Sequence, residues 1–357
     1  MSLLRMFDAF VRHHISLLWM ASLSFADCHT IDTPSLSPPI LVVGATGTTG
    51  LRAIQGLLDV GYKPLQLHIV TRNASKAKMK ELSQLGCHLV EADLQRPRSL
   101  HDIGKGCIGC YIHATGGDTK DLDTSEVSSA RNLCDALHED VRSIVYNSAA
   151  GAKDHGVARI QQKHEIEMIL SKRKRTPACR VTSLRANIFG EELWKEYTRP
   201  EILKGRYPLP VAWWRKIYLT SVRDMGRLAG SIIARQSEDD MNEQPDDDLS
   251  CTSIRVLNVA GDRLTGPQIA KSFRLAQGSK CRHYNNRELT KMAKESFPEL
   301  YEQIHFLQNS REKTNIASLK REFPGLITPF AEFLEETKWG EQERKFEDLS
   351  NPATLEF

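Results

Sequence analysis

Residues Ile40 to Leu58 read ILVVGATGTTGLRAIQGLL, and this stretch decides the fold of the chain. It opens with a continuous apolar run, passes through a loop with glycines at Gly44, Gly47 and Gly50, and ends in apolar residues at helical spacing. A short continuous apolar run is typical of a strand buried on both faces. The stretch therefore predicts a strand, a tight glycine loop and a helix, in that order.

The three glycines have the spacing and the context of a dinucleotide-binding loop. Gly44 permits the tight turn, Gly47 lets the backbone approach a pyrophosphate, and Gly50 lets the helix pack closely on the strand. The free N–H groups and the dipole at the helix start favour negative phosphates. Further hydroxyl donors are expected from Thr46, Thr48 and Thr49. The alternative is a strand–turn–helix with a structural role only.

Short apolar runs alternate with amphipathic stretches on both sides of this loop. We expect strands at about 40–44, 66–71, 87–91, 108–113, 142–147 and 179–185. We expect helices at about 48–60, 74–85, 97–104, 122–139 and 157–172. Alternation of this kind predicts an α/β fold, a doubly wound Rossmann-type parallel sheet with helices on both faces.

The pattern loosens after residue 186, which predicts a smaller C-terminal α/β lobe whose later strand and helices return to the core. The acidic run at 237–250, SEDDMNEQPDDDLS, predicts a disordered surface loop. The expected divisions are a leader and linker at 1–38, a nucleotide-binding core at 39–186, the lobe at 187–340 and a tail at 341–357.

The composition describes a chain that can bury a large core. It has 357 residues, 40% of them hydrophobic and 26% charged. The net charge of +3 is small for this length, so the chain as a whole gives no argument for nucleic acid or an anionic membrane as partner. The basic run SKRKRT near Lys172 is read as a solvated turn rather than a nucleic-acid patch, since no aromatic or basic stripe accompanies it.

The cysteines predict neither a metal site nor a disulfide framework. There are eight of them, and only Cys107 and Cys110 are closely spaced. A zinc site would need a second ligand pair, and none stands at a suitable distance. We therefore expect ordinary reduced thiols and no bound metal.

The N-terminus has features of a targeting segment. Arg5 and Arg12 precede twelve uncharged residues, ISLLWMASLSFA, a length that suits a signal peptide but not a bilayer span of ~20 apolar residues. A poorly ordered or amphipathic extension fits equally well, because Asp8 interrupts the basic region. The compartment stays open between cytoplasm and an organelle, with plastid or endoplasmic-reticulum targeting as options, and no stable membrane span is expected in the mature chain.

The end of the second expected strand indicates which dinucleotide would bind. An NAD site usually carries an acid there for the ribose 2′-OH, whereas this strand ends in Thr71, Arg72 and Asn73 with Lys76 one turn on. Arg72 is suited to pair with a 2′-phosphate. NADP(H) is therefore favoured over NAD(H).

The third strand ends at Asp93 and Leu94, which we expect to lie beside the adenine. Asp93 could accept a hydrogen bond from the adenine amino group, or it could cap the following helix. The sequence leaves these two roles open.

The motifs as a set resemble the NmrA-like group of atypical short-chain dehydrogenases/reductases, over roughly Ile40 to Leu334. The segments that carry the resemblance are GATGTTG, TRN, EADL, YIHATGG, YNSAAGA, KHEIEMIL, LRANIFGE, YLTSVRDMGRLAG and NVAGDRLTGPQIAKSF. They are specific for the fold and for cofactor binding rather than for one reaction.

The resemblance implies a nicotinamide near Ala114, Thr115, Ser148 and Lys163. Reductases of the wider superfamily use a Ser, a Tyr and a Lys, and Ser148 and Lys163 match two of them as expected catalytic groups. Arg159 stands where the Tyr would be, four residues before Lys163. Because arginine stays charged near neutral pH, it cannot relay a proton.

Other groups could complete the site. His155, in a loop, is a candidate to replace the missing proton donor, although a solvated loop histidine is the simpler interpretation; His164 should point away from the Lys163 face. The substrate pocket is expected to be walled by Ala149, Asn187, Trp194 and Trp213. The lobe's aromatic residues could equally form the hydrophobic core that joins the two parts.

Two functions follow from these features. One is an NADP(H)-dependent oxidoreductase acting on a small carbonyl, quinone or enone substrate. The other is a non-catalytic sensor that binds NADP(H) and reports to a protein partner. The missing Tyr favours the sensor, and the retained Ser148 and Lys163 favour the enzyme.

Overall fold

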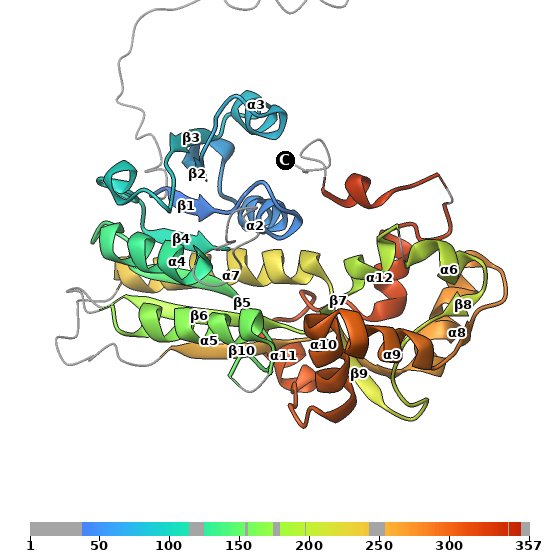
Figure 1. The fold of residues 1–357 in the computed structure, drawn as a ribbon. Helices are drawn as coiled ribbons and strands as arrows, with labels where there is room; N and C mark the ends of the chain where they lie inside the picture. The colour runs from blue at the N-terminus through green and yellow to red at the C-terminus, as the bar shows by residue number, and fades with distance from the viewer. Residues whose placement is uncertain are drawn as a thin grey trace, which may run out of the picture. The chain divides into compact units, whose positions relative to one another are not determined.

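A parallel sheet of seven strands, counted over the described residues, forms the centre of the protein (Figure 1). The computed structural model describes residues 38–113, 125–153, 156–173, 179–196, 198–242, 254–341 and 343–350. The strands are, in spatial order, β10 (Arg255–Val259), β6 (Arg180–Ala186), β5 (Ser143–Ala149), β4 (Gly109–Ile112), β1 (Ile40–Val43), β2 (Leu67–Thr71) and β3 (His88–Glu91). Every pairing in this sheet is parallel, and the predicted doubly wound α/β fold is confirmed.

The strand order reverses beside β1. The chain winds from β1 through β2 to β3 on one side and from β4 through β5 to β6 on the other. In an open parallel sheet, ligands bind outside the carboxyl ends of the strands at such a reversal. The topology therefore places the candidate site at the ends of β1 and β4.

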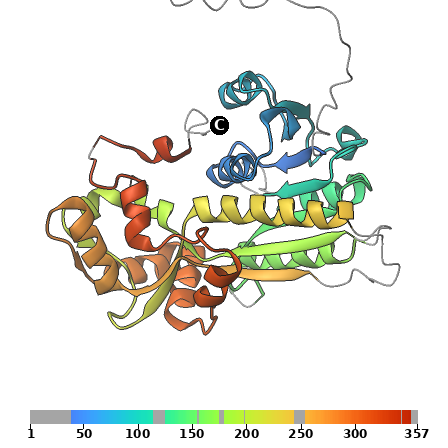
Figure 2. The ribbon, with the colours of Figure 1, turned by 180° about the vertical axis from the view of Figure 1, so that it is seen from behind.

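Helices cover both faces of the sheet and enclose two hydrophobic cores (Figures 1 and 2). One face carries α2 (Thr48–Asp59), α3 (Ala77–Gln84) and α7 (Val222–Asn242). The other carries α4 (Ser125–Ala136) and α5 (Ala158–Ser171). The side chains of β1 alternate between the cores, with Ile40 and Val42 in one and Leu41 and Val43 in the other, which explains the unbroken apolar run.

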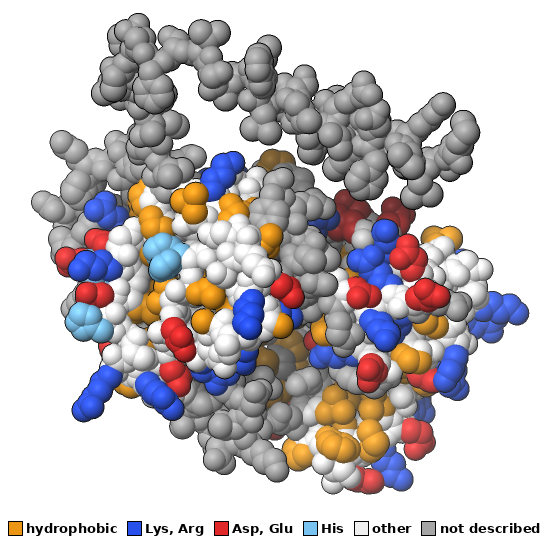
Figure 3. Space-filling model, turned by 90° about the horizontal axis from the view of Figure 1, so that it is seen from above, with side chains coloured by type: hydrophobic (Ala, Val, Ile, Leu, Met, Phe, Trp, Pro, Cys, Tyr) orange, Lys and Arg blue, Asp and Glu red, His pale blue; other side chains and the backbone are white. Residues whose placement is uncertain are grey.

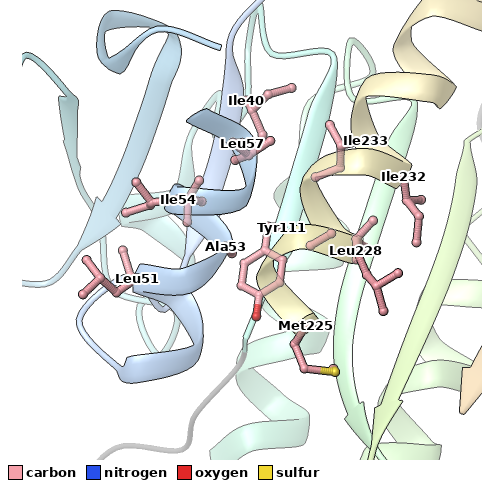
Figure 4. Packing of buried hydrophobic residues seen from close by; sticks show 14 of the residues in the cluster. Ile40, Leu51, Ala53, Ile54, Leu57, Tyr111, Met225, Leu228, Ile232 and Ile233 are labelled. Atoms are coloured by element: carbon pink, nitrogen blue, oxygen red, sulfur yellow. The ribbon is translucent and has the colours of Figure 1, made fainter. Parts of the chain in front are cut away.

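Helices α2 and α7 approach unusually closely because glycines line their contact. A Cβ added to Gly226 would meet the carbonyl oxygen of Arg52 at 1.9 Å, and one on Gly56 would meet that of Gly226 at 2.0 Å. Apolar side chains fill the space around this contact (Figure 4). They include Ile40, Leu51, Ala53, Ile54 and Leu57 on one side and Tyr111, Met225, Leu228, Ile232 and Ile233 on the other.

The C-terminal lobe has its own core of buried aromatic and aliphatic residues. Its strands are β7 (Ile188–Phe189), β9 (Lys216–Thr220) and β11 (Asp262–Thr265) in one small sheet, and β8 (Arg206–Tyr207) with β12 (Arg282–His283) in another. Its helices are α6 (Arg199–Leu203), α8 (Gly266–Gln277), α9 (Arg287–Ser296), α10 (Pro298–Asn309), α11 (Ile316–Glu322) and α12 (Phe330–Glu336). Short 3₁₀ turns are η1 (Pro64–Gln66), η2 (Pro97–Leu100), η3 (Gly190–Trp194) and η4 (Phe346–Ser350). Strand β10 leaves the lobe and pairs with β6.

Two segments differ from the sequence-based expectation. The helix predicted at 97–104 is only the turn η2, because His101 leaves helical backbone with a ψ of 129° and Asp102 has a positive φ of 54°. Helix α7 continues to Asn242, into the start of the acidic run that was predicted as a disordered loop. Most of that run, the leader before Pro38 and the tail from 351 lie outside the described residues.

The surface carries mixed charge. On the face seen in Figure 3, acidic and basic side chains are interspersed over the described elements. In the described part of the chain, no helix has both the length and the apolar character needed to cross a bilayer.

Candidate cofactor-binding site

The loop between β1 and α2 is held tightly by its glycines. Gly44 has a φ of +87°, and a Cβ at this position would meet the carbonyl oxygen of His113 at 2.4 Å. A Cβ on Gly50 would meet the carbonyl oxygen of Gly44 at 2.2 Å. The protein itself therefore requires glycine at both positions.

Gly47 differs from the other two glycines. A Cβ there would have only one neighbour within 4 Å, the carbonyl oxygen of Gly44 at 3.8 Å, so packing within the described chain does not require glycine. Gly47 is the N-cap of α2, no side chain caps the helix, and its first turn carries no acid. The N–H groups at the start of α2 are thus available to an anion. Thr46 is exposed, Thr48 is half-buried and Thr49 is buried.

A pocket lies beside this loop at the carboxyl ends of β1 to β4. Its lining includes Gly44, Thr46, Arg72, Lys76 and His113. Arg72 and Lys76 are exposed and follow the end of β2, where no carboxylate stands. Lys78 does not line the pocket, but its ammonium lies at the glycine loop, where Nζ donates to the carbonyl oxygen of Thr46 at 3.4 Å.

Asp93 and Leu94 also line this pocket, and both are half-buried. The carboxylate of Asp93 accepts from the backbone N–H of Gln95 at 3.0 Å and lies 3.5 Å from Arg96 Nε. This hydrogen bond closes a local turn and does not cap the next helix, because the N-cap of η2 is Arg96 and no side chain bonds to the start of η2. Contact of Asp93 with an adenine stays a prediction.

Ser148, near the end of β5, belongs to a buried polar network. Its Oγ donates to Oε1 of Glu167 at 2.8 Å, and only 4% of the residue is exposed. The same carboxylate accepts from Ser183 at 2.6 Å and from two nitrogens of Arg185 at 2.9 and 2.6 Å. Burial alone would raise the pKa of Glu167, but the hydrogen bonds from Arg185, Ser183 and Ser148 lower it below its usual value. His164 Nδ1 lies 3.2 Å from this carboxylate, away from Lys163 as predicted.

Lys163, on α5, forms an ion pair with Glu126 at the start of α4. Its side chain is 14% exposed, that of Glu126 is 8% exposed, and the ammonium lies 5.8 Å from the centre of the Tyr146 ring. Glu167 stands four residues after Lys163 on the same helix, but it bonds to Ser148 and not to Lys163. No contact between the described atoms joins Lys163 directly to Ser148.

Several predicted residues lie where the structure gives no side-chain description. Ala114, Thr115 and His155 fall outside the described residues. Arg159 lies within α5, one helical turn before Lys163, as expected from the spacing.

The predicted pocket walls have other roles. Trp194 is 2% exposed and packs edge-on against Trp339 at 5.1 Å, so it belongs to the lobe core rather than to a pocket wall. Asn187 Nδ2 donates to the carbonyl of Val259 at 2.9 Å and to the hydroxyl of Thr314 at 3.1 Å, which ties β6 to the lobe. Trp213 is 66% exposed on the surface, and Ala149, the last residue of β5, is half-buried.

Sequence reasoning missed two polar residues at the sheet edge. His113, which follows β4 and lines the pocket, has its Nδ1 2.7 Å from Nδ2 of Asn147 on β5. Asn147 is 3% exposed, and its Oδ1 has no hydrogen-bond partner among the described residues. The sequence did contain an indication of this pair, because His113 and Asn147 stand near the ends of two expected strands. The ends of neighbouring parallel strands meet at one edge of the sheet.

Two buried acids lie where the lobe joins the core. Burial raises the pKa of Glu191 to about 8, against hydrogen bonds from backbone N–H groups that lower it. Burial likewise raises the pKa of Asp224 to about 6, although Thr328 donates two hydrogen bonds to this carboxylate. Glu191 accepts from the backbone N–H of Val222 at the start of α7, and Asp224 accepts from Thr328 in the segment before α12, so these acids connect parts of the fold and do not line the cofactor pocket.

A doubly wound parallel sheet with a glycine loop at its switch point defines a nucleotide-binding α/β protein of the Rossmann class. The chain belongs to the NmrA-like family, whose model matches residues 37–334. The resemblance noted from the motifs is therefore confirmed.

The chain is similar to curated proteins over part of its length. It is 24% identical over 138 residues to an NmrA-like family domain-containing oxidoreductase, ptmS, of Penicillium ochrochloron, a match covering 36% of this chain and 41% of that protein. The chain spans less than half the length of the curated relatives it matches.

Two solved structures have the same fold. The Citrobacter sp. triphenylmethane reductase complexed with NADP(H) matches with a TM-score of 0.61 at 18% identity, covering 84% of this chain and 99% of that one. The negative transcriptional regulator NmrA in complex with NADP matches with a TM-score of 0.60 at 14% identity, covering 84% and 95%. One of these proteins is a reductase and the other a regulator, so the shared fold does not choose between the two functions.

Proposed function

We propose that this chain is an NADP(H)-dependent oxidoreductase that acts on a small carbonyl compound, a quinone or an enone. The observation that carries the proposal is the end of β2, which presents Arg72 and Lys76 to the pocket and no carboxylate. Two cations favour the 2′-phosphate of NADP(H), whereas an NAD site uses an acid at this position.

The residues around the glycine loop fit a dinucleotide. The N-terminus of α2 is uncapped, and Gly47 leaves open space where a side chain would otherwise stand. In the proposal, this helix start and Thr46 hold the pyrophosphate. Arg72 holds the 2′-phosphate, while Asp93 and Leu94 lie beside the adenine.

The bound cofactor would supply the hydride. Lys163 supplies a cationic group at the nicotinamide end, where its ammonium can donate to a ribose hydroxyl while Glu126 holds it in place. Ser148 acts as a positioning residue, because its hydroxyl donates to buried Glu167. The substrate would lie against the end of β5 at Ala149. The similarity to a fungal oxidoreductase and to a reductase structure supports this class of chemistry.

Cofactor binding and turnover are tested separately. NADPH and NADH are titrated by cofactor fluorescence into wild type and Arg72→Ala, and we expect wild type to prefer NADPH and the variant to lose most of that preference. Equal binding of NADH to wild type would overturn the NADP(H) assignment. NADPH oxidation is then followed against quinones, aldehydes and enones, with Lys163→Ala as the control.

A sensor of NADP(H) that binds a protein partner is the second candidate. Both Ser148 and Lys163 are held by buried carboxylates, and Arg159 stands at the position of the usual proton donor. These contacts favour a site that binds the cofactor without reacting it, as does the similarity in fold to a transcriptional regulator. Tight NADPH binding with no turnover above the Lys163→Ala control would support this function over the first.

A further inference from the structure

Two neighbouring tryptophans are exposed on the C-terminal lobe. Trp213 is 66% exposed and Trp214 is 65% exposed, and their rings meet edge to face with centroids 5.5 Å apart. The lobe does not need them for its core, in which Trp194 and Trp339 are buried. Adjacent large aromatic groups exposed in this way mark an interaction surface.

The two tryptophans form the tip of a tight turn, here called the tryptophan turn (residues 212–215). The backbone N–H of Arg215 donates to the carbonyl of Ala212 at 2.9 Å, so Trp213 and Trp214 occupy the two central positions. Glycine, proline, asparagine and aspartate are the residues that stabilise such positions. The stability of the turn therefore does not explain why tryptophan occupies these two positions.

The base of the tryptophan turn is fixed to the lobe. Val211 is fully buried, and Gln308 Nε2 donates to the carbonyl of Pro210 at 2.7 Å. Arg215 Nε donates to the carbonyl of Leu307 at 3.0 Å. The segment between β8 and β9 lies at the lower edge of the lobe in Figures 1 and 2. The indoles are thus presented on a rigid support at an edge of the protein.

A cationic pocket of about 550 Å³ adjoins the turn. Trp214, Arg215, Lys216 and Arg263 line it, together with amide side chains. Arg263 on β11 is opposite Tyr218 on β9. Among the described residues, no acid lines this pocket and no carboxylate pairs with its three cations. An anion with several oxygens would relieve the mutual repulsion of these cations.

We propose that the tryptophan turn and its cationic pocket dock the protein on an anionic membrane surface. The pocket takes the phosphate of a lipid headgroup, and the two indoles enter the interfacial layer, where tryptophan is favoured. A small soluble anion in the pocket would leave Trp213 in water, because Trp213 does not line it. A bilayer would cover both indoles together with the two exposed cations, Lys216 and Arg263. The attraction is local, so it does not need a large net charge on the chain.

The test uses the full chain and vesicles of phosphatidylcholine, alone or mixed with phosphatidylglycerol. Binding is measured by co-sedimentation and by the tryptophan emission maximum, with inorganic phosphate as the soluble probe. The variants are Trp213→Ala/Trp214→Ala and Lys216→Glu/Arg263→Glu. The matched controls alter an exposed apolar residue and an exposed cation elsewhere, Leu275→Ala and Lys80→Glu.

We expect wild type to bind the mixed vesicles with a blue-shifted emission and to bind phosphatidylcholine alone much more weakly. The double tryptophan variant should lose on the order of tenfold in partitioning. The charge variant should lose at least roughly fivefold for each cation, with a weaker dependence on salt. The controls should behave as wild type, and unchanged thermal unfolding shows that the variants fold.

Three outcomes would overturn the proposal. The first is vesicle binding that neither variant reduces, which would assign it to another part of the chain. The second is equal binding to both kinds of vesicle. The third is the absence of vesicle binding. If inorganic phosphate still shifts the tryptophan emission, the surface would bind a soluble anion; if it does not, the surface would bind a protein partner.

Discussion

The hydroxyl of Ser148 donates to Oε1 of Glu167 at 2.8 Å, beneath the edge of the sheet where a substrate-facing serine was expected. Glu167 lies 19 residues further along the chain and is 1% exposed. The hydroxyl proton is thus directed at a carboxylate that also accepts from Ser183 and Arg185. We therefore expect Ser148 to stabilise the structure around the site rather than to act on the substrate.

Ser148→Ala should cost about 1–3 kcal/mol of folding stability, since a buried bond to a charged acceptor is lost. Folding lowers the pKa of Glu167, so its stabilising effect is present above the unfolded pKa of 4.5 and is lost as the pH falls. The cost should therefore be larger at pH 7 than in acid. Urea unfolding at both pH values measures it. Unchanged stability together with complete loss of turnover would instead give Ser148 a direct role in the reaction.

Gly47→Ala and Gly50→Ala should separate cofactor binding from folding. A Cβ on Gly47 has open space within the protein, so this variant should fold with near wild-type stability but bind NADPH at least tenfold more weakly. A Cβ on Gly50 meets a carbonyl oxygen at 2.2 Å and should destabilise the fold by roughly 1–3 kcal/mol. Thermal unfolding without cofactor and NADPH titration distinguish the two effects. If Gly47→Ala binds NADPH as tightly as wild type, the pyrophosphate does not bind at this loop.

Gly226→Ala should destabilise the protein by forcing α2 and α7 apart at their closest contact. The added Cβ would meet the carbonyl oxygen of Arg52 at 1.9 Å, and both partners are helix backbone that cannot yield locally. We expect a loss of roughly 3 kcal/mol or more, at the upper end of what overpacking costs. Chemical denaturation measures it, with Gly47→Ala as the glycine-to-alanine control. A loss below that of the control would show that the two helices are not packed this closely.

Glu191→Gln should stabilise the protein at alkaline pH. Burial raises the pKa of Glu191 to about 8, so its favourable effect is full below the unfolded pKa of 4.5 and is lost as the pH rises through about 8. Wild type should therefore lose stability between pH 5 and 8, and the variant should lose less of it. At about 1.4 kcal/mol per pKa unit, the difference at pH 8 is on the order of a few kcal/mol. The control is Glu192→Gln, at a neighbouring side chain that is 46% exposed. Parallel pH profiles for wild type and Glu191→Gln would contradict the buried, protonated state.

The sequence by itself determined the elements that depend on neighbouring residues. The apolar run at Ile40, the glycines that follow and the amphipathic α2 act within a few residues of one another, so their pattern is visible in the chain. The parallel sheet follows as well, because alternating strands and helices can close in few ways. The position of Arg72 at the end of β2 was equally local, and in the structure this residue lines the pocket beside the glycine loop.

Only the tertiary structure decided which partners the polar and aromatic side chains have. Lys163 pairs with Glu126, 37 residues away, and Ser148 with Glu167, although spacing along the helix also offered Lys163 the nearer Glu167. Trp194 and Trp213 are the same residue type in one aromatic stretch, yet the first is in the core and the second on the surface. Burial depends on how distant segments pack, and a hydrogen bond needs atoms within about 3 Å. Neither the burial of a side chain nor the distance to its hydrogen-bond partner can be deduced from spacing along the chain, since both are set when the strands and helices pack together.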